Sequence, residues 1–520
     1  MFIKNEVRKN VYFDSVTLMV ASSKIRQMEG ISNAAVMMGT DHNRSLMTDA
    51  GLLGQGLPEF GPNDTVIGIC ARDEAAAQAA IDYFESFLNG KKSAPAATGE
   101  VRTETLEEAR DLNSQLNLAV VSVPGRFAAT EAEKVLDQGM HVLLFSDNVS
   151  LEDEVALKKK AVEKGLLMMG PDCGTAIING TALGFANAVR RGNIGLAAAA
   201  GTGLQEVTVI IDDLGGGITQ GLGTGGRDLK EEVGGSMMGL CLDALVQDPE
   251  TEVIVIISKP PAPSVLEKLK EQLRDVTKPV IAIVMGGDPD LFQGSGILCA
   301  SDLEQAARMA VKAARGEPAE AGEEDTALLQ ALAREECAKL QPGQRFLRGL
   351  YSGGTLCYES MLILERGGVP TWSNIAIDKS RLLQGDEPSR AHTLLDMGED
   401  FFTNGMPHPM IDFRQRVMRM EKEAADPQTA VLLLDCVGGY GTHENPAGEL
   451  SGAITAAREA AAVQGRYLSV IASVTATEQD PQVRSRQRQQ LEQAGAIVMP
   501  SNAQAARLAA AIIQSLEGGV

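Results

Sequence analysis

A set of short motifs occurs twice along this chain, and this duplication most limits how residues 193–520 can fold. Each copy has a Gly/Thr-rich turn, an Asp-Pro phrase that opens an apolar run, and a Gln-Ala-Ala-Arg phrase. The paired motifs begin at Gly201 and Gly353, Asp248 and Asp426, and Gln305 and Gln504. The offset between partners grows from 152 residues (Leu204 to Leu356) to 199 residues (Ala307 to Ala506). Preserved order with a growing offset predicts two diverged copies of one domain, the second carrying insertions.

Length and composition set the class of protein. A chain of 520 residues is too long for one core, so we expect three or four domains. The formal net charge is -22 without any Lys/Arg block, which argues against nucleic acid and anionic membranes as partners. No apolar run has the length of a membrane span, and the start lacks an apolar signal core. Seven scattered cysteines without a C-x-x-C pair favour a reducing compartment, so we predict a cytoplasmic protein.

Strand and helix patterns alternate along the chain. Residues 10–95 read as strand–helix–strand and then helix–strand–helix, which is typical of a small α+β domain of ferredoxin-like type. Residues 90–100 and 316–325 have the composition of linkers. Elsewhere apolar strands end in Gly, Pro or Asp turns that lead into helices, as parallel α/β sheets require.

Several phrases after Leu116 resemble the α subunit of succinyl-CoA synthetase and its NDP-forming acyl-CoA synthetase relatives. VSVPGRFAATEA, LLFSDNVS and LLMMGPDCGTAIING are similar to strands and ligand loops of that family's CoA-binding domain, and GNIGLAAAAGTGLQE is similar to its ligase domain. Within that superfamily the whole chain most resembles the FdrA family, through VYFDSVTLM, MGPDCGTAIING, GTGGRDL, SKPPAP, GGTLC and FTNGMPHPMID.

This resemblance implies an α/β architecture with four domains. A ferredoxin-like α+β domain precedes a truncated Rossmann-like domain of CoA-binding type and two flavodoxin-like ligase repeats that pack against each other. The predicted domains span residues 1–95, 100–190, 191–315 and 326–520.

The resemblance also implies a function. We expect carbamoyl or acyl transfer through a phosphate anhydride, most concretely as a subunit of oxamate carbamoyltransferase in purine catabolism, which converts oxalurate and phosphate into oxamate and carbamoyl phosphate. The alternatives are an NDP-forming acyl-CoA synthetase subunit, which needs a nucleotide-grasp partner, and a non-catalytic regulatory or scaffold subunit. The expected ligands are a small carboxylate or carbamoyl substrate and phosphate. We expect partner subunits of a hetero-complex and a homo-oligomer, while the use of CoA or nucleotide stays open.

The chain departs from the synthetase pattern in two places. No G-x-G-x-x-G occurs before Leu116, where the synthetase's CoA domain begins with a Gly-rich βαβ unit. The stretch from Met285 to Asp302, which corresponds to the synthetase's phosphohistidine loop, contains no histidine. The preceding strand ends in Ser258 and Lys259 where the synthetase has a supporting glutamate. On this alignment the first copy cannot carry the family's phosphohistidine relay.

Glycine-rich turns are the first candidate sites. Exposed amides at a helix start favour phosphate or carboxylate, and both copies place such a turn between a strand and a helix. The predicted anion contacts are Gly201, Thr202, Gly203, Gly353, Gly354 and Thr355. A further loop holds Gly225, Gly226 and Arg227, and the arginine is suited to two-pronged pairing with an anion. The alternatives are plain tight turns and a surface Arg–Asp pair.

The second copy supplies histidines. His443 follows a buried strand among glycines that include Gly441, where open α/β sheets place ligands, and it could shuttle a proton or stabilise an oxyanion. His408 lies in an upstream loop with Asn404 and Asp412. A structural hydrogen bond is the alternative for each histidine, and a metal site at His408, Asp412 and His443 has only a weak spacing signal. We therefore predict His443, Arg227 and His408 as catalytic, no bound metal, and one active site between the copies.

Overall fold

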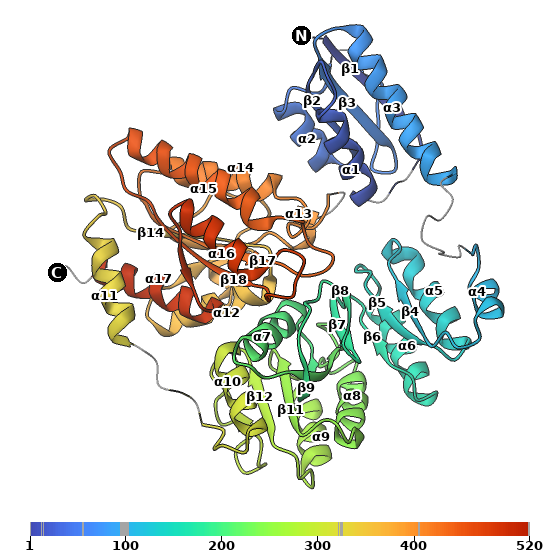
Figure 1. Cartoon of the computed structure of the whole chain (residues 1–520), viewed down its shortest axis with the longest axis vertical. Helices are drawn as coiled ribbons and strands as arrows, with labels where there is room; N and C mark the ends of the chain where they lie inside the picture. The colour runs from blue at the N-terminus through green and yellow to red at the C-terminus, as the bar shows by residue number, and fades with distance from the viewer. Residues whose placement is uncertain are drawn as a thin grey trace. The chain divides into compact units, whose positions relative to one another are not determined.

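The computed structural model describes residues 2–93 except 12, 14, 55 and 56, residues 103–403 except 321 and 323–325, and residues 406–517 (Figure 1). The chain forms two compact units, and each is described by itself. The first unit comprises Met1–Ala109 and Gly398–Asp412, and the second comprises Arg110–Met397 and Phe413–Val520.

The first unit is built on a three-stranded antiparallel sheet in the order β1–β3–β2. Every residue of the central strand β3 is buried, because this apolar segment is paired on both edges. Leu18, Ile25, Ile69 and Phe84 belong to the core that joins α1 and α3 to the sheet. The elements are β1 (Phe2–Arg8), α1 (Ser15–Arg26), β2 (Ile31–Met38), α2 (Asp41–Asp49), β3 (Thr65–Ala71) and α3 (Glu74–Ser93). This is the small α+β domain that the sequence predicts.

Two predicted positions in this unit are wrong. The first strand is Phe2–Arg8, ahead of residue 10, where the predicted strand–helix pattern begins. Asn10 has a φ of 54° and donates its amide to Asp64 (2.8 Å), so the chain turns immediately after the strand. In addition, α3 continues to Ser93, so the first residues of the predicted linker 90–100 are helical. Residues 94–100 of that linker lie outside the described residues.

The second unit contains a small parallel sheet in the order β4–β5–β6. Its helices α5 and α6 pack against each other. The elements are β4 (Leu118–Val121), α5 (Gly125–Asp137), β5 (His141–Leu144), α6 (Leu151–Glu163) and β6 (Met168–Met169), and α4 (Leu106–Leu112) precedes them. Three parallel strands with two intervening helices fit the truncated Rossmann-like domain.

A seven-stranded sheet forms the first repeat, in the order β13–β12–β11–β9–β10–β7–β8. Its parallel strands β9 to β13 have the flavodoxin-like order, and β7 and β8 add an antiparallel hairpin. The hairpin comes from residues that the sequence assigned to 100–190, so this sheet crosses the predicted boundary at 190. The elements are β7 (Thr175–Ile178), β8 (Thr181–Gly184), β9 (Arg191–Ala198), α7 (Gly201–Asp213), β10 (Ile218–Gly223), α8 (Ser236–Gln247), β11 (Val253–Ser258), α9 (Pro263–Leu273), β12 (Val280–Val284), β13 (Leu298–Cys299) and α10 (Leu303–Ala314).

The second repeat has the same strand order, β16–β14–β17–β18–β19, with β15 added at one edge. All of its strand pairs are parallel. The elements are α11 (Thr326–Cys337), β14 (Phe346–Tyr351), α12 (Gly354–Arg366), β15 (Thr371–Trp372), η1 (Lys379–Arg381), β16 (His392–Asp396), α13 (Asp400–Thr403), α14 (Arg414–Ala425), β17 (Thr429–Val437), α15 (Pro446–Val463), β18 (Ser469–Thr475), α16 (Arg484–Gln493), β19 (Ile497–Met499) and α17 (Asn502–Glu517). The added strand β15, and residues 398–412, which belong to the first unit, account for part of the growing offset between paired motifs.

The repeated motifs fall on equivalent elements of the two sheets. The glycine turns begin α7 and α12, the Asp-Pro phrases precede β11 and β17, and the Gln-Ala-Ala-Arg phrases lie near the starts of α10 and α17. The repeats contact each other through α7 and α12, and Ala186 pairs with Tyr440 across the same boundary. The duplication inferred from the motifs is therefore a duplication of fold.

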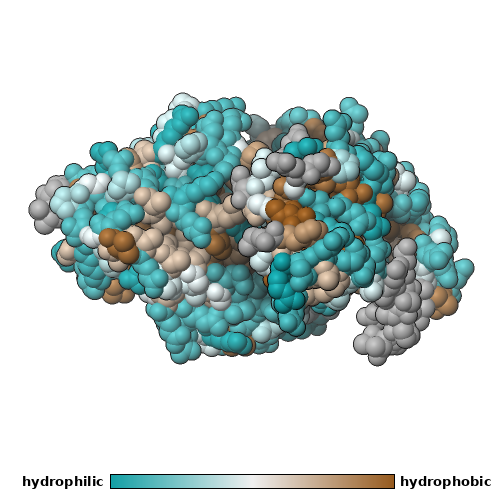
Figure 2. All heavy atoms as spheres, turned by 90° about the horizontal axis from the view of Figure 1, so that it is seen from above, coloured by the Kyte–Doolittle hydropathy of each residue, from teal (hydrophilic) through white to brown (hydrophobic). Residues whose placement is uncertain are grey.

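The surface fits an acidic chain. Figure 2 shows a face that is mostly hydrophilic, with apolar residues in small scattered groups. Within the part of the chain that the structure describes, no helix has both the length and the apolar character needed to cross a membrane.

Candidate active site

The starts of α7 and α12 are the first feature of the candidate site. α7 begins at Gly201 just after β9, and α12 begins at Gly354 just after β14. Neither helix has a capping side chain at its N-cap residue, Ala200 or Gly353. Amides in a first turn have no acceptor within the helix, so both starts are suited to an anion.

The two helix starts pack directly against each other. A Cβ atom placed on Gly203 would lie 3.0 Å from Thr355 Cγ2, and one placed on Gly353 would lie 3.0 Å from Thr202 Cγ2. The missing side chains allow this approach, which gives the glycines a packing role besides any contact with a ligand. The structure thus brings together the two predicted glycine turns, one from each copy.

An internal carboxylate already binds part of the α12 turn. Asp435 accepts hydrogen bonds from the amides of Ser352 (2.9 Å) and Gly353 (2.8 Å), and it forms an ion pair with the fully buried Arg416 (2.8 Å). Asp396 lies over Gly354, where an added Cβ would meet its Oδ2 atom at 2.3 Å. The α12 start is therefore more acidic than the α7 start, and α7 offers the better anion site.

The cysteines of these loops are buried thiols. Burial raises the pKa of Cys357 well above its usual value, and the nearby charges of Asp396 and Asp435 raise it further. Burial raises the pKa of Cys436 to about 12. Both side chains therefore stay protonated and serve as small apolar residues of the core.

Lys259 is a cation at this edge that the sequence reasoning did not select. It follows the carboxyl end of β11, and its Nζ lies 4.6 Å from the centre of the Tyr358 ring on α12. Its charge lowers the pKa of the Cys357 thiol, although burial has the larger opposite effect. A Cβ placed on Gly286, just past β12, would lie 2.8 Å from the Tyr358 hydroxyl. The signal that could have identified Lys259 was its position after a buried parallel strand.

Arg227 has a structural partner. Its guanidinium forms an ion pair with the buried Glu154 (2.8 Å) and donates a hydrogen bond to the Val149 carbonyl (2.9 Å). The next residue, Asp228, pairs with the buried Lys158 (2.9 Å). These contacts fasten the loop to α6. Catalysis by Arg227 remains a prediction.

The neighbouring glycines of this loop differ from each other. Gly225 has a φ of 85°, and an added Cβ would lie 2.6 Å from the Pro171 carbonyl oxygen. An added Cβ on Gly226 would meet nothing within 4 Å. Close packing therefore requires glycine at the first position only, and anion contacts by either residue stay predictions.

His443 lies in a loop after β17 that Gln482 holds in place. Its Nδ1 accepts a hydrogen bond from the Asn445 amide (3.1 Å), so the neutral ring carries its proton on Nε2. Gln482 donates to the His443 carbonyl oxygen (3.0 Å), and the ring meets Phe413 edge-on at 5.7 Å between centroids. Gly441 in this loop packs on Gly184, since an added Cβ would lie 3.0 Å from its carbonyl oxygen. The loop thus lies at the boundary between the copies, where we predicted the active site.

His408 belongs to the first unit. Its Nδ1 accepts a hydrogen bond from the Met410 amide (3.2 Å), and its carbonyl accepts one from the amide of Asp412 (3.0 Å). Asn404 lies outside the described residues. Because His408 and His443 belong to different units, a joint role for the two histidines stays a prediction. Over the described ranges, no group of three His, Cys, Asp or Glu side chains is arranged to hold a metal ion.

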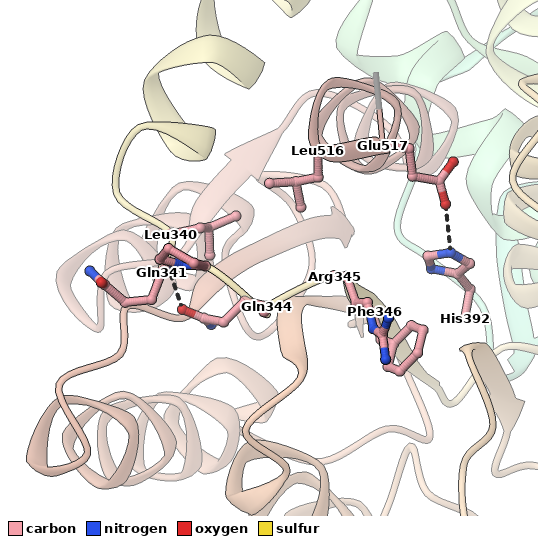
Figure 3. A pocket seen from close by; sticks show the side chains of 10 residues that line it. Leu340, Gln341, Gln344, Arg345, Phe346, His392, Leu516 and Glu517 are labelled. Carbon is pink, nitrogen blue, oxygen red and sulfur yellow. Dashed lines mark hydrogen bonds and ion pairs between the residues drawn. The ribbon is translucent and has the colours of Figure 1, made fainter. Parts of the chain in front are cut away.

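A cavity of about 660 Å³ lies at the other end of the second repeat (Figure 3). Its walls include Phe346 and His392, the first residues of β14 and β16, so it opens at the amino ends of the strands. His392 Nε2 faces Glu517 at 3.5 Å, and burial lowers the pKa of this histidine. The glycine turn at Gly353 lies at the opposite end of β14.

One relative resembles this chain along its whole length. Protein YahF of Escherichia coli K12, an uncharacterized protein, is 44% identical over 510 residues, which cover 98% of each chain. The chain belongs to the YahF family.

Two family models match parts of this YahF-family chain. A model described as CoA-ligase matches residues 350–512, and one described as "AllF, heavy metal-associated domain" matches residues 1–104. The α subunit 1 of an ADP-forming succinate–CoA ligase from Archaeoglobus fulgidus is 25% identical over 186 residues, which cover 35% of this chain and 62% of that one. The CoA-ligase match lies within the second repeat, which is therefore ligase-like.

Among solved structures, the dinucleotide forming acetyl-coenzyme A synthetase 1 of Ca. Korarchaeum cryptofilum covers 82% of this chain and 88% of its own, at 17% identity and a TM-score of 0.37. A TM-score this low carries no argument about how the parts of the YahF-family chain are arranged.

Proposed function

We propose that this chain is a subunit of an acyl-CoA ligase-type enzyme that binds phosphate, or the phosphoryl group of an acyl phosphate, at the first turn of α7, beside its contact with the first turn of α12. The observation that carries the proposal is the direct packing of these two turns, one from each repeat. The CoA-ligase match over residues 350–512 and the similarity to a succinate–CoA ligase α subunit support the reaction class. Those relatives are named as subunits, so we also propose partner subunits and a cytoplasmic complex.

The proposed site holds its anion without a covalent relay. Residues 285–302 contain no histidine, so the phosphoryl group would be held by the α7 amides and by the Lys259 ammonium group. In acyl transfer to phosphate, a phosphate oxygen attacks the acyl carbon and the acyl donor's leaving group departs. His443, with its proton on Nε2, is suited to donate a hydrogen bond to the departing group as negative charge develops there. Asp435 and Asp396 would keep the anion on the α7 side.

Calorimetric titration of the chain with inorganic phosphate tests the site. We expect Lys259→Met to weaken phosphate binding by about tenfold, because a charged hydrogen bond is lost. The control is Lys268→Met, which removes an exposed lysine on α9 and should leave binding unchanged. Equal affinity in both variants would contradict the role of Lys259. No binding by the wild type would contradict the proposed site as a whole.

A second candidate function is carbamoyl transfer, the reaction that the resemblance to the FdrA family implies. It is favoured by the missing relay histidine and by Lys259 at the position of the synthetase's supporting glutamate. Direct attack of phosphate on the carbamoyl carbon of oxalurate would release oxamate and form carbamoyl phosphate, and no nucleotide is consumed. Phosphate-dependent cleavage of oxalurate by the chain with its natural partners would support this candidate. CoA-dependent nucleotide turnover would support the ligase, and inactivity in both assays would support a regulatory or scaffold subunit.

A further inference from the structure

Two buried glutamates join the repeats in a reciprocal arrangement. Glu206 is in α7 of the first repeat, and Glu359 is in α12 of the second. Both follow the glycine turns within the same helices, and each residue is 2% exposed. Each is the sixth residue of its helix, counted from Gly201 in α7 and from Gly354 in α12, so the duplicated fold relates the two glutamates.

Each glutamate binds the start of the last helix of the opposite repeat. Glu206 accepts a hydrogen bond from the amide of Asn502 (2.9 Å), the first residue of α17. Glu359 accepts one from the amide of Leu303 (2.8 Å), the first residue of α10. A carboxyl oxygen at a helix start satisfies an amide that has no partner within the helix. Both bonds cross the boundary between the repeats.

Side-chain donors complete the arrangement. The Thr475 hydroxyl, at the end of β18, donates to Glu206 (2.6 Å). The Asn502 amide group donates to Glu359 (2.8 Å) and to the Leu356 carbonyl in the first turn of α12 (2.9 Å). Asn502 therefore contacts both glutamates, one through its main chain and the other through its side chain.

We propose that Glu206 and Glu359 are positioning residues that hold the first turns of α7 and α12 against each other. The glutamates lie in the same helices as the paired turns, less than two helical turns further on. Each helix is thereby fastened to the last helix of the other repeat, and these bonds set the distance between the first turns of α7 and α12. The expected change in phosphate affinity rests on the proposed function. The expected change in the packing of the helix starts does not.

Hydrogen exchange measured by mass spectrometry tests these cross-repeat hydrogen bonds in the absence of a ligand. Glu206→Met removes the acceptor at nearly constant volume, whereas Glu206→Gln keeps an oxygen for the Asn502 amide. We expect about tenfold faster exchange at the starts of α17 and α12 in the methionine variant, and near wild-type exchange in the glutamine variant. The control is Glu267→Gln, an exposed residue of α9. Unchanged exchange at both helix starts in Glu206→Met would overturn the proposal.

Phosphate affinity then separates positioning from plain stability. At a temperature where the Glu206→Met and Glu359→Met variants are folded by circular dichroism, we expect each to bind phosphate about tenfold more weakly than the wild type. Wild-type affinity in folded variants whose helix starts exchange faster would overturn the positioning role. If the wild type itself binds no phosphate, the proposed function fails. The exchange experiment alone then decides whether Glu206 and Glu359 hold the two helices together.

Discussion

Replacing Lys158 with methionine should destabilise the attachment of α6 to the first repeat. The Lys158 side chain is 1% exposed and contacts Glu154 (2.8 Å), Asp228 (2.9 Å) and the Thr224 carbonyl oxygen (2.9 Å). Methionine keeps most of the volume but leaves two buried carboxylates without this cation. Breaking a buried pair in this way costs about 3–5 kcal/mol.

Other contacts of the two carboxylates should keep the free-energy cost of Lys158→Met near the lower end of this range. Arg227 still pairs with Glu154 (2.8 Å), and the amides of Met237 and Met238 still donate to Asp228. We therefore expect a loss of about 3 kcal/mol in the free energy of local opening, which is roughly a hundredfold in the opening constant. Native-state hydrogen exchange over α6 and the loop at residues 224–237 measures this quantity without assuming two-state unfolding of the whole chain.

The matched control is Lys160→Met, two residues further along the same helix. Lys160 is 29% exposed and pairs with Glu133 and Asp137 at the surface, so its loss should cost less than about 1 kcal/mol. If Lys158→Met lowered the free energy of local opening by less than about 1 kcal/mol, or if the two variants lowered it equally, the buried ion pairs would not be what holds α6 to the first repeat.

Three further predictions concern the site and its surroundings. Gly353→Val should lower phosphate affinity about tenfold, because the new valine side chain would collide with Thr202. Gly226→Ala should have no effect, because the added methyl group meets nothing within 4 Å, and calorimetry compares the two variants. His443→Asn should lower turnover about a hundredfold while the melting temperature changes little, since the asparagine oxygen can accept the Asn445 amide in place of Nδ1; reaction rates and thermal scans measure the two effects. Burial and the nearby Asp302 raise the pKa of Glu359 from 4.5 to about 8, so the folded chain keeps a proton that the unfolded chain releases. Stability should therefore fall as pH rises from about 4.5 to 8, and Glu359→Gln should flatten that slope in thermal scans across this range.

The sequence predicted the duplication correctly because motif order and spacing survive divergence. The turns at Gly201 and Gly353 begin equivalent helices, and the two sheets share one strand order. The glutamates that follow these turns were visible in the sequence, but their partners were not. Glu206 binds the start of a helix almost 300 residues away, and no local pattern encodes that contact.

Other site residues depended on tertiary contacts that the sequence does not display. The glycine-rich setting of Arg227 suggested a ligand, yet its ion-pair partner is Glu154 on a helix that precedes the first repeat. Sequence adjacency assigned His408 to the second repeat, but residues 398–412 belong to the first unit, where Met406 packs in an apolar core with Met47. Burial of an apolar side chain thus determined the location of this loop.

The most direct test of the central claim is a crystal structure of the chain grown with saturating phosphate. The account predicts a phosphate ion at the first turn of α7, within about 3 Å of its main-chain amides and within reach of the Lys259 ammonium group. No phosphate at the first turn of α7 in crystals saturated with phosphate, or a phosphate bound only elsewhere, would contradict it.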